Sequence, residues 1–352
     1  MTKKLICAMS GGVDSSVAAA LLKETDGFEV IGAFMKVWPG DKLKKSEERA
    51  RRIAKALKIP FYVFDFEKEF KKRIVHCFLS GYKKGKTPNP CVECNKEIKF
   101  GLLLKKARQL GAKFITTGHY ARIRKGQDRI KLVKAKDKNK DQSYFLWKLN
   151  QKQLKYILFP VGGYTKNEVK KMAKEFNLPL SGVSESQEIC FIEKDTNDFL
   201  KYYLKTKPGN IIDTKGRIIG QHQGLWFYTI GQRKGIKVPQ GPFYVAGKDL
   251  KKNILIVTKN EKDLDKRELI AKNVNWISRR APKLPLKIKA KIRYRHQSAL
   301  AIITKKLKPK SYKLIFDKSQ RAITPGQSVV FYKREEVLGG GIIVKGNVSK
   351  SL

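Results

Sequence analysis

The chain of 352 residues carries 77 Lys and Arg against 31 Asp and Glu, which gives a formal net charge of +46. Its length predicts two or three domains, and a hydrophobic fraction of 41% excludes wholesale disorder. No apolar run approaches the ~18 residues of a membrane helix, and Gly11, Gly12 and Asp14 interrupt any signal-peptide core, so we expect a soluble, cytoplasmic protein with no membrane partner.

Strand and helix patterns alternate along the first half of the chain. Strand-like apolar runs lie at 4–9, 28–38, 61–66 and 113–121. Helix-like segments lie at 14–24, 47–59, 68–79, 95–112 and 166–178. This alternation predicts an α/β fold with a doubly wound parallel sheet, and ligands bind such sheets beyond the carboxyl ends of the strands.

Short β-type runs and Gly or Pro turns dominate after about residue 205. They include Ile254–Thr258 and Ser328–Lys333, and they predict two small β-rich domains, of which the last is a β-barrel. We therefore expect domains of residues 1–203, 204–270 and 271–352.

A glycine-rich heptamer, Ser10–Ser16, joins the first predicted strand to the first helix. Its glycines allow backbone N–H groups to face an anion, and the helix N-terminus adds positive potential. An ordinary capped turn is the alternative interpretation. The heptamer is not the P-loop of phosphoryl transfer, because the GxxxxGK[ST] lysine is absent.

The five cysteines are an odd number, which argues against a disulfide framework. We expect Cys7 and Cys77 to be small buried hydrophobic residues. Prolines precede Cys91 and Cys94, and a helix is predicted to start near Asn95. This would place Cys94 at a helix N-terminus, where the dipole and Lys96 favour a thiolate. Half of a metal site, or an inert structural pair, are the alternatives, but no second CxxC exists and we expect no protein-bound metal.

Nine segments in this order resemble tRNA-specific 2-thiouridylases, along nearly the whole chain: SGGVDSS, TPNPCVECNKEIKF, TGHYAR, KDQSYFL, LFPVG, ICFI, GQHQGLWFYTIGQRKG, KIRYRH and TPGQSVVFY. The first is also similar to the SGGxDS loop of ATP pyrophosphatases, which transfer AMP and release pyrophosphate. One departure is Cys91, where the family commonly has an acidic residue.

The resemblance implies roles for three groups of residues. The catalytic residues would be Asp14, Cys94 and Cys190, although Cys190 alone reads as a strand core residue. The nucleotide would contact Ala8, Met9, Ser10, Gly11, Gly12, Val13, Asp14, Ser15, Met35 and Gly118. The tRNA would contact Asn89, Pro90, Cys91, His119, Lys140, Asp141, Gln142, Arg293, Tyr294, Arg295 and Gln327.

The implied reaction is 2-thiolation of wobble uridine 34 in tRNAs for Lys, Glu and Gln, with ATP and Mg²⁺ as cofactors. AMP transfer to the C2 oxygen would create a leaving group. A persulfide on Cys190, loaded by a cysteine desulfurase or a sulfur-relay protein, would supply sulfur. Cys94 would either release sulfide from that persulfide or resolve a later adduct, and both orders leave a Cys94–Cys190 disulfide.

Basic residues gather near the C-terminus. Residues 281–313 contain eleven Lys or Arg and no Asp or Glu. Lys287, Lys289, Lys291, Arg293 and Arg295 alternate with apolar residues, which predicts one charged face of a strand. The charges in such a row repel one another unless a polyanion covers them. We therefore interpret the row as an RNA-binding surface, and not as a solvated strand face or as the result of a lysine-rich genome.

Two other functions remain as alternatives. A small-molecule adenylating ligase would need neither paired cysteines nor a basic β module. A non-catalytic RNA-binding protein would have no use for the SGGVDSS loop.

Overall fold

A five-stranded parallel sheet lies at the centre of the N-terminal part of the computed structural model, which describes residues 2–180, 189–192, 195–239 and 241–346. Its strands follow the order β3-β2-β1-β4-β7. Their bounds are β1 (Lys3–Ala8), β2 (Phe28–Lys36), β3 (Phe61–Asp65), β4 (Phe114–Thr117) and β7 (Ile157–Leu158). The predicted α/β fold with a doubly wound parallel sheet is confirmed.

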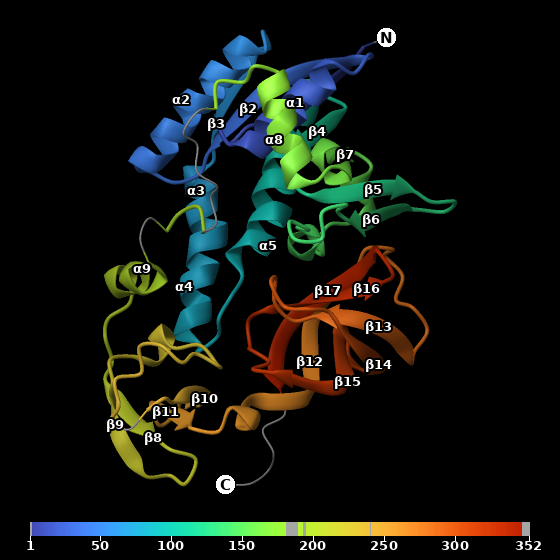
Figure 1. Cartoon of the computed structure of the whole chain (residues 1–352). Helices are drawn as coiled ribbons and strands as arrows, with labels where there is room; N and C mark the ends of the chain where they lie inside the picture. Colours follow the sequence, from blue (N-terminus) through green and yellow to red (C-terminus); the bar gives the residue numbers. More distant parts are fainter. Residues whose placement is uncertain (1, 181–188, 193–194, 240, 347–352) are drawn as a thin grey trace.

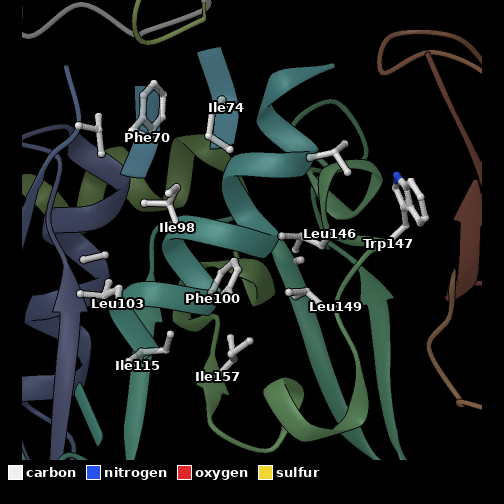
Figure 2. Close-up of a cluster of buried hydrophobic side chains, with 14 of the residues drawn as sticks. Phe70, Ile74, Ile98, Phe100, Leu103, Ile115, Leu146, Trp147, Leu149 and Ile157 are labelled. Atoms are coloured by element: carbon white, nitrogen blue, oxygen red, sulfur yellow. The ribbon is translucent and has the colours of Figure 1, made fainter. Parts of the chain in front are cut away.

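Helices cover both faces of this sheet. Successive side chains of a strand point to opposite sides, and in β1 the side chains of residues 5–8 are apolar on both sides and must be buried. Leu5 and Cys7 of β1 pack on one side with α1 (Val13–Lys23), α2 (Asp41–Ala56) and α8 (Lys166–Glu175). Ile6 and Ala8 pack on the other side. Phe70 and Phe100 cover that side from two long helical segments (Figures 1 and 2). These are α3 (Glu67–Phe70), η1 (Lys71–Val75) and α4 (His76–Lys83), then α5 (Pro90–Cys94), η2 (Asn95–Leu103) and α6 (Leu104–Gln109).

A four-stranded sheet forms the middle of the chain, in the order β10-β11-β8-β9. Its strands are β8 (Gly209–Ile212), β9 (Ile218–His222), β10 (Tyr244–Asp249) and β11 (Ile254–Thr258). Its small core contains Ile211, Val245 and Leu255. The short helices α9 (Thr196–Tyr203) and η5 (Leu225–Phe227) connect it to the rest of the chain.

Six C-terminal strands close into a β-barrel, because β12 pairs with both β15 and β17. The strands are β12 (Asp265–Trp276), β13 (Leu286–Lys291), β14 (Ala299–Lys308), β15 (Ser311–Arg321), β16 (Ser328–Lys333) and β17 (Glu336–Gly346). The predicted barrel is confirmed. The boundary that we expect between residues 270 and 271 falls inside β12, since the barrel begins at Asp265.

A hairpin from the N-terminal part extends the barrel sheet, which the sequence patterns do not predict. It consists of β5 (Ala121–Lys125) and β6 (Ile130–Lys134), and Val133 pairs with Glu336 of β17. The remaining helical turns are η3 (Ser143–Leu146), α7 (Gln151–Leu154), η4 (Pro160–Gly163) and η6 (Glu261–Leu264). Among the described residues, no helix is long and apolar enough to cross a membrane.

Candidate functional site

Hydrogen bonds of its own serines fix the conformation of the loop between β1 and α1. Ser10 donates its backbone N–H to the Ser15 hydroxyl over 3.1 Å, and the hydroxyl of Ser15 donates to the Gly12 carbonyl over 3.0 Å. Gly11 has a φ of +72°, a conformation that favours glycine. The chain therefore turns tightly at the carboxyl end of β1, where α1 presents its N-terminus. An anion could bind there.

Gly118, which follows β4, lies directly against this loop. A Cβ at Gly118 would lie 2.5 Å from the Ser15 nitrogen and 2.6 Å from the Asp14 carbonyl carbon. The absence of a side chain thus allows two backbone segments to touch. The neighbouring strands β1 and β4 bring these predicted nucleotide residues together.

Asp14 accepts two hydrogen bonds on the same oxygen, Oδ1. The Tyr120 hydroxyl donates over 2.8 Å, and the Lys166 ammonium donates over 2.6 Å. Tyr120 and Lys166 are both buried, at 2% and 7% exposure. The sequence patterns did not predict a role for Lys166. The available signal was the position of Lys166, which follows the LFPVG segment and begins a helix.

The other predicted nucleotide residues differ in exposure. Ala8 and Met9 are buried, so only their backbone could contact a ligand. Gly12 and Val13 are partly exposed at the start of α1. Met35 is partly exposed near the carboxyl end of β2, on the same edge of the sheet as the loop. Stacking of adenine on Met35 stays a prediction.

The helix that carries Cys94 begins earlier than predicted. Asn89 caps α5 by accepting a hydrogen bond from the Cys91 N–H over 3.2 Å, and Pro90 occupies the first helical position. Cys91 and Cys94 are three residues apart, so they lie on the same side of α5. Cys94 is in the second turn and continues into η2 without a break, so its placement at a helix N-terminus is wrong.

Burial, rather than a helix dipole, dominates the acidity of these thiols. It raises the pKa of Cys94 to about 12 and that of Cys91 to about 11. The cation that opposes this effect is Lys99, whereas Lys96 pairs with Glu97 at 3.0 Å. The expectation of a thiolate favoured by Lys96 is therefore wrong. The charge that favours a Cys94 thiolate is that of Lys99.

Cys190 reaches the same region from a distant part of the chain. Its charge raises the pKa of both Cys91 and Cys94, so the three thiols lie within electrostatic reach of one another. Cys190 is exposed, yet protein atoms around its sulfur raise its pKa, which Lys99 and Lys42 partly offset. The preceding Ser186–Glu188 lie outside the described residues.

Aromatic packing fixes the segment next to Cys190. Phe191 is buried against Trp38, Phe70 and Phe78, with ring centroids 5.9, 5.6 and 5.4 Å away. Of the remaining cysteines, Cys7 is buried as expected, but Cys77 is exposed on α4. The five thiols form no disulfide, and the described residues contain no group of three or more potential metal ligands.

Removal of the Lys99 charge should suppress thiol reactivity. Because the pKa of Cys94 is about 12, its alkylation by iodoacetamide should keep rising with pH up to about pH 10, without a plateau. Lys99→Met raises that pKa further and should slow alkylation up to about tenfold at a fixed pH. Lys96→Met is the matched control and should leave the rate unchanged. Equal rates for both variants would contradict the role of Lys99.

The predicted base-contacting loop is organised by Asp141, which is buried. Its Oδ1 accepts from the N–H groups of Ala135 and Ser143, both at 3.1 Å. Gln142 accepts the Tyr120 N–H over 3.0 Å through its side-chain oxygen. Asp141 therefore shapes the loop from inside. Lys140 and Gln142 are partly exposed beside it.

The residues expected on the anticodon arm are not all at the surface. His119 is buried between Phe100 and Phe159 and forms a hydrogen bond with Thr117 over 2.7 Å. Its contact with tRNA stays a prediction. Burial and Lys99 hold its pKa well below the usual range.

The other expected tRNA residues lie in the barrel, and two of them contact the N-terminal part of the chain. Tyr294 packs on Phe145 with ring centroids 4.5 Å apart. Gln327 donates to the Thr87 carbonyl over 2.7 Å, just before α5. Arg293 donates to the carbonyls of Arg321 and Ala322 over 2.5 and 2.8 Å, and Arg295 is exposed.

The basic row is shorter than predicted. Along β13, Lys287 and Lys289 are exposed, and the residues between and after them, Ile288 and Ala290, are buried. Arg293 and Arg295 lie beyond the strand in a turn, so they do not continue it. Lys291 is partly buried, and the charge of Asp141 acts on it, so the row ends next to the base-contacting loop.

The carboxyl edge of the sheet thus holds the Ser10–Ser16 loop, and the helix that carries Cys91 and Cys94 lies close to it. A path of contacts links them, since Gly118 touches the loop and is followed by His119, which packs on Phe100. Phe100 follows Lys99 on the cysteine helix. A parallel sheet with such a loop after its first strand defines the class of nucleotide-binding HUP domains.

Family models match three successive parts of the chain: the tRNA methyl transferase HUP domain at 3–194, the tRNA methyl transferase PRC-barrel domain at 197–259 and the Aminomethyltransferase beta-barrel domain at 266–343. The chain is 46% identical to the tRNA-specific 2-thiouridylase MnmA of Clostridium botulinum, over 97% of this chain and 98% of that protein. The MnmA proteins of Clostridioides difficile and Moorella thermoacetica are also 46% identical, over 98% and 96% of this chain and 99% and 98% of their own. The chain belongs to the tRNA-specific 2-thiouridylase family of enzymes.

Proposed function

We propose that this enzyme replaces the C2 oxygen of wobble uridine 34 by sulfur in tRNAs for Lys, Glu and Gln, and that it consumes ATP in doing so. The observation that supports this most directly is the short series of contacts from the Ser10–Ser16 loop through Gly118, His119 and Phe100 to the helix that carries Cys94. A nucleotide and a sulfur carrier joined by such contacts suit a reaction that activates an oxygen and then replaces it.

The first step is adenylation. Uridine O2 attacks the α-phosphorus of ATP, a P–O bond breaks, and pyrophosphate leaves. The loop fits a triphosphate with Mg²⁺, because it offers N–H groups, the Ser10 hydroxyl and an oxygen of Asp14 that could hold the ion. When bound, Mg²⁺ offsets the charge of the phosphates.

The second step transfers sulfur. A cysteine desulfurase or a sulfur-relay protein loads Cys190, which is exposed and so within reach of a protein donor. The Cys94 thiolate attacks the Cys190 sulfur of the persulfide, forming the disulfide and releasing hydrosulfide. Hydrosulfide attacks C2 and AMP leaves. In the other order, the persulfide attacks C2 first and Cys94 resolves the adduct. An external reductant reopens the disulfide.

The division of labour that we propose assigns residues 1–203 to chemistry in the cytoplasm. The four-stranded sheet and the barrel, which begins at Asp265, would hold tRNA. The barrel supplies the exposed Lys287 and Lys289, and the row ends at the loop of Lys140–Gln142. The target base must leave its stack to reach this loop.

Removal of the exposed lysines should weaken the binding of all tRNAs alike. Lys287→Ala with Lys289→Ala should lower the slope of log K against log salt by about 0.7–0.9 for each phosphate that is no longer neutralised. The control, Lys105→Ala with Lys106→Ala, removes the same charge from exposed positions of α6. Titration of tRNA binding from low to moderate salt measures the slopes. A wild-type slope in the barrel variant would make the row a solvated strand face.

Mass spectrometry of tRNA nucleosides tests the proposed function. The protein is incubated with unmodified tRNA, ATP, Mg²⁺ and a persulfide donor, and 2-thiouridine at position 34 is expected only when all are present. A small-molecule ligase would release pyrophosphate without tRNA, and a non-catalytic binding protein would release none. Either result would refute the proposal.

A further inference from the structure

A buried lysine completes the loop that lacks one. The Ser10–Ser16 segment has no lysine of its own, yet it must receive a polyanion under the proposed function. Lys166 comes to it from a helix 152 residues further along the chain, and its ammonium lies 2.6 Å from Asp14 Oδ1. A side chain of this kind is rarely buried unless it is paired.

Hydrogen bonds fix the backbone of Lys166 and the start of the helix that carries it. Its backbone N–H donates to Asp137 Oδ2 over 3.0 Å. Thr165 caps the helix and accepts the Glu168 N–H, while the Glu168 carboxylate accepts from Thr165 in return. The helix α8 packs on α1, the helix that carries Asp14 (Figure 1). The ammonium is therefore delivered to the loop by fixed structure, and not by a flexible surface side chain.

The pairing resolves an electrostatic conflict. A carboxylate in a loop that receives phosphates repels them, unless a cation offsets its charge. Lys166 provides that charge, and Tyr120 adds a hydrogen bond to the same oxygen over 2.8 Å. The second oxygen of Asp14 accepts from no other described residue, and the Asp14 side chain is 34% exposed. One oxygen is thus fixed by the protein, and part of the Asp14 side chain stays accessible to a ligand.

We infer that Lys166 is a positioning residue for nucleotide binding: it fixes Asp14 and neutralises it, so that the loop accepts ATP. The inference rests on the proposed function, since it presumes that the loop binds a triphosphate. It differs from direct phosphate binding by Lys166, because its effect must pass through the charge of Asp14.

A double-mutant cycle on ATP affinity tests this. The probe is a non-hydrolysable ATP analogue, titrated by calorimetry against the full chain without tRNA. The variants are compared without divalent cations, so that Mg²⁺ binding by Asp14 does not enter the cycle, and the wild-type protein is also titrated with Mg²⁺. Lys166→Met should weaken binding by about tenfold or more, since it leaves the Asp14 carboxylate without its charge partner. Asp14→Asn combined with Lys166→Met should recover most of that affinity. Lys171→Met removes a charge from an exposed position of the same helix and should bind as wild type.

Two outcomes overturn the inference. Binding by Lys166→Met at the wild-type level would make the pair merely structural, and a double variant as weak as Lys166→Met would make Lys166 a direct phosphate ligand. Lys166→Gln repeats the measurement if the Met variant does not fold. Failure of the wild-type protein to bind the analogue would contradict the ATP-dependent activity itself, and the inference with it.

Discussion

Replacement of Cys94 or of Cys190 by serine should abolish 2-thiouridine formation while tRNA binding remains. The hydroxyl of serine can neither carry a persulfide nor form the disulfide that closes the proposed cycle. Both thiols lie within electrostatic reach of each other and of Lys99, so one event could link them. Nucleoside mass spectrometry and a tRNA binding titration measure the two outcomes. Measurable turnover of either variant would remove that cysteine from the mechanism.

Cys91→Ser is the matched control, because Cys91 shares the helix and the burial of Cys94. It should retain most activity. Stoichiometric zinc that disappears in this variant would instead assign Cys91 and Cys94 to a metal site.

Gly118→Ala should eliminate pyrophosphate release, although it adds a single methyl group. The new Cβ would lie 2.5 Å from the Ser15 nitrogen, so either the loop or β4 must shift. Backbone on both sides cannot rotate away as a side chain would. We expect a loss of stability of about 1–3 kcal/mol from overpacking, together with a larger loss of activity as the loop is displaced.

The control for Gly118→Ala is Gly163→Ala, because a Cβ at Gly163 would meet nothing within 4 Å. Thermal unfolding separates the two effects of the substitution. A stable Gly118→Ala protein with wild-type pyrophosphate release would show that the loop geometry is not needed for the chemistry.

Local patterns predicted the parts of the site that depend on local conformation. The glycine-rich heptamer lies between β1 and α1 as expected, because its turn is encoded by its own residues. The start of the cysteine helix was missed, although Pro90 and Asn89 carried a signal for it. Proline at the first helical position and asparagine at the cap are common helix starts.

Contacts between distant segments could not be predicted from the same patterns. The Lys166–Asp14 pair depends on how α8 packs against α1, and nothing local to either residue encodes it. Burial of His119 likewise follows from Phe100 and Phe159, which come from two other elements. The prediction of a thiolate at Cys94 was wrong for the same reason, because the sequence does not show how much protein covers the sulfur.

The barrel is bonded to the sheet domain through buried groups. Trp147 donates its indole N–H to the Ser328 hydroxyl over 3.0 Å, and Tyr144 donates to the Ser328 carbonyl over 2.9 Å. Glu336 pairs with Val133 of the hairpin. These contacts fix the lysines of β13 at a set distance from the reacting groups. If the barrel holds tRNA as we propose, this fixed distance would select which nucleotide of the anticodon arm reaches the thiols.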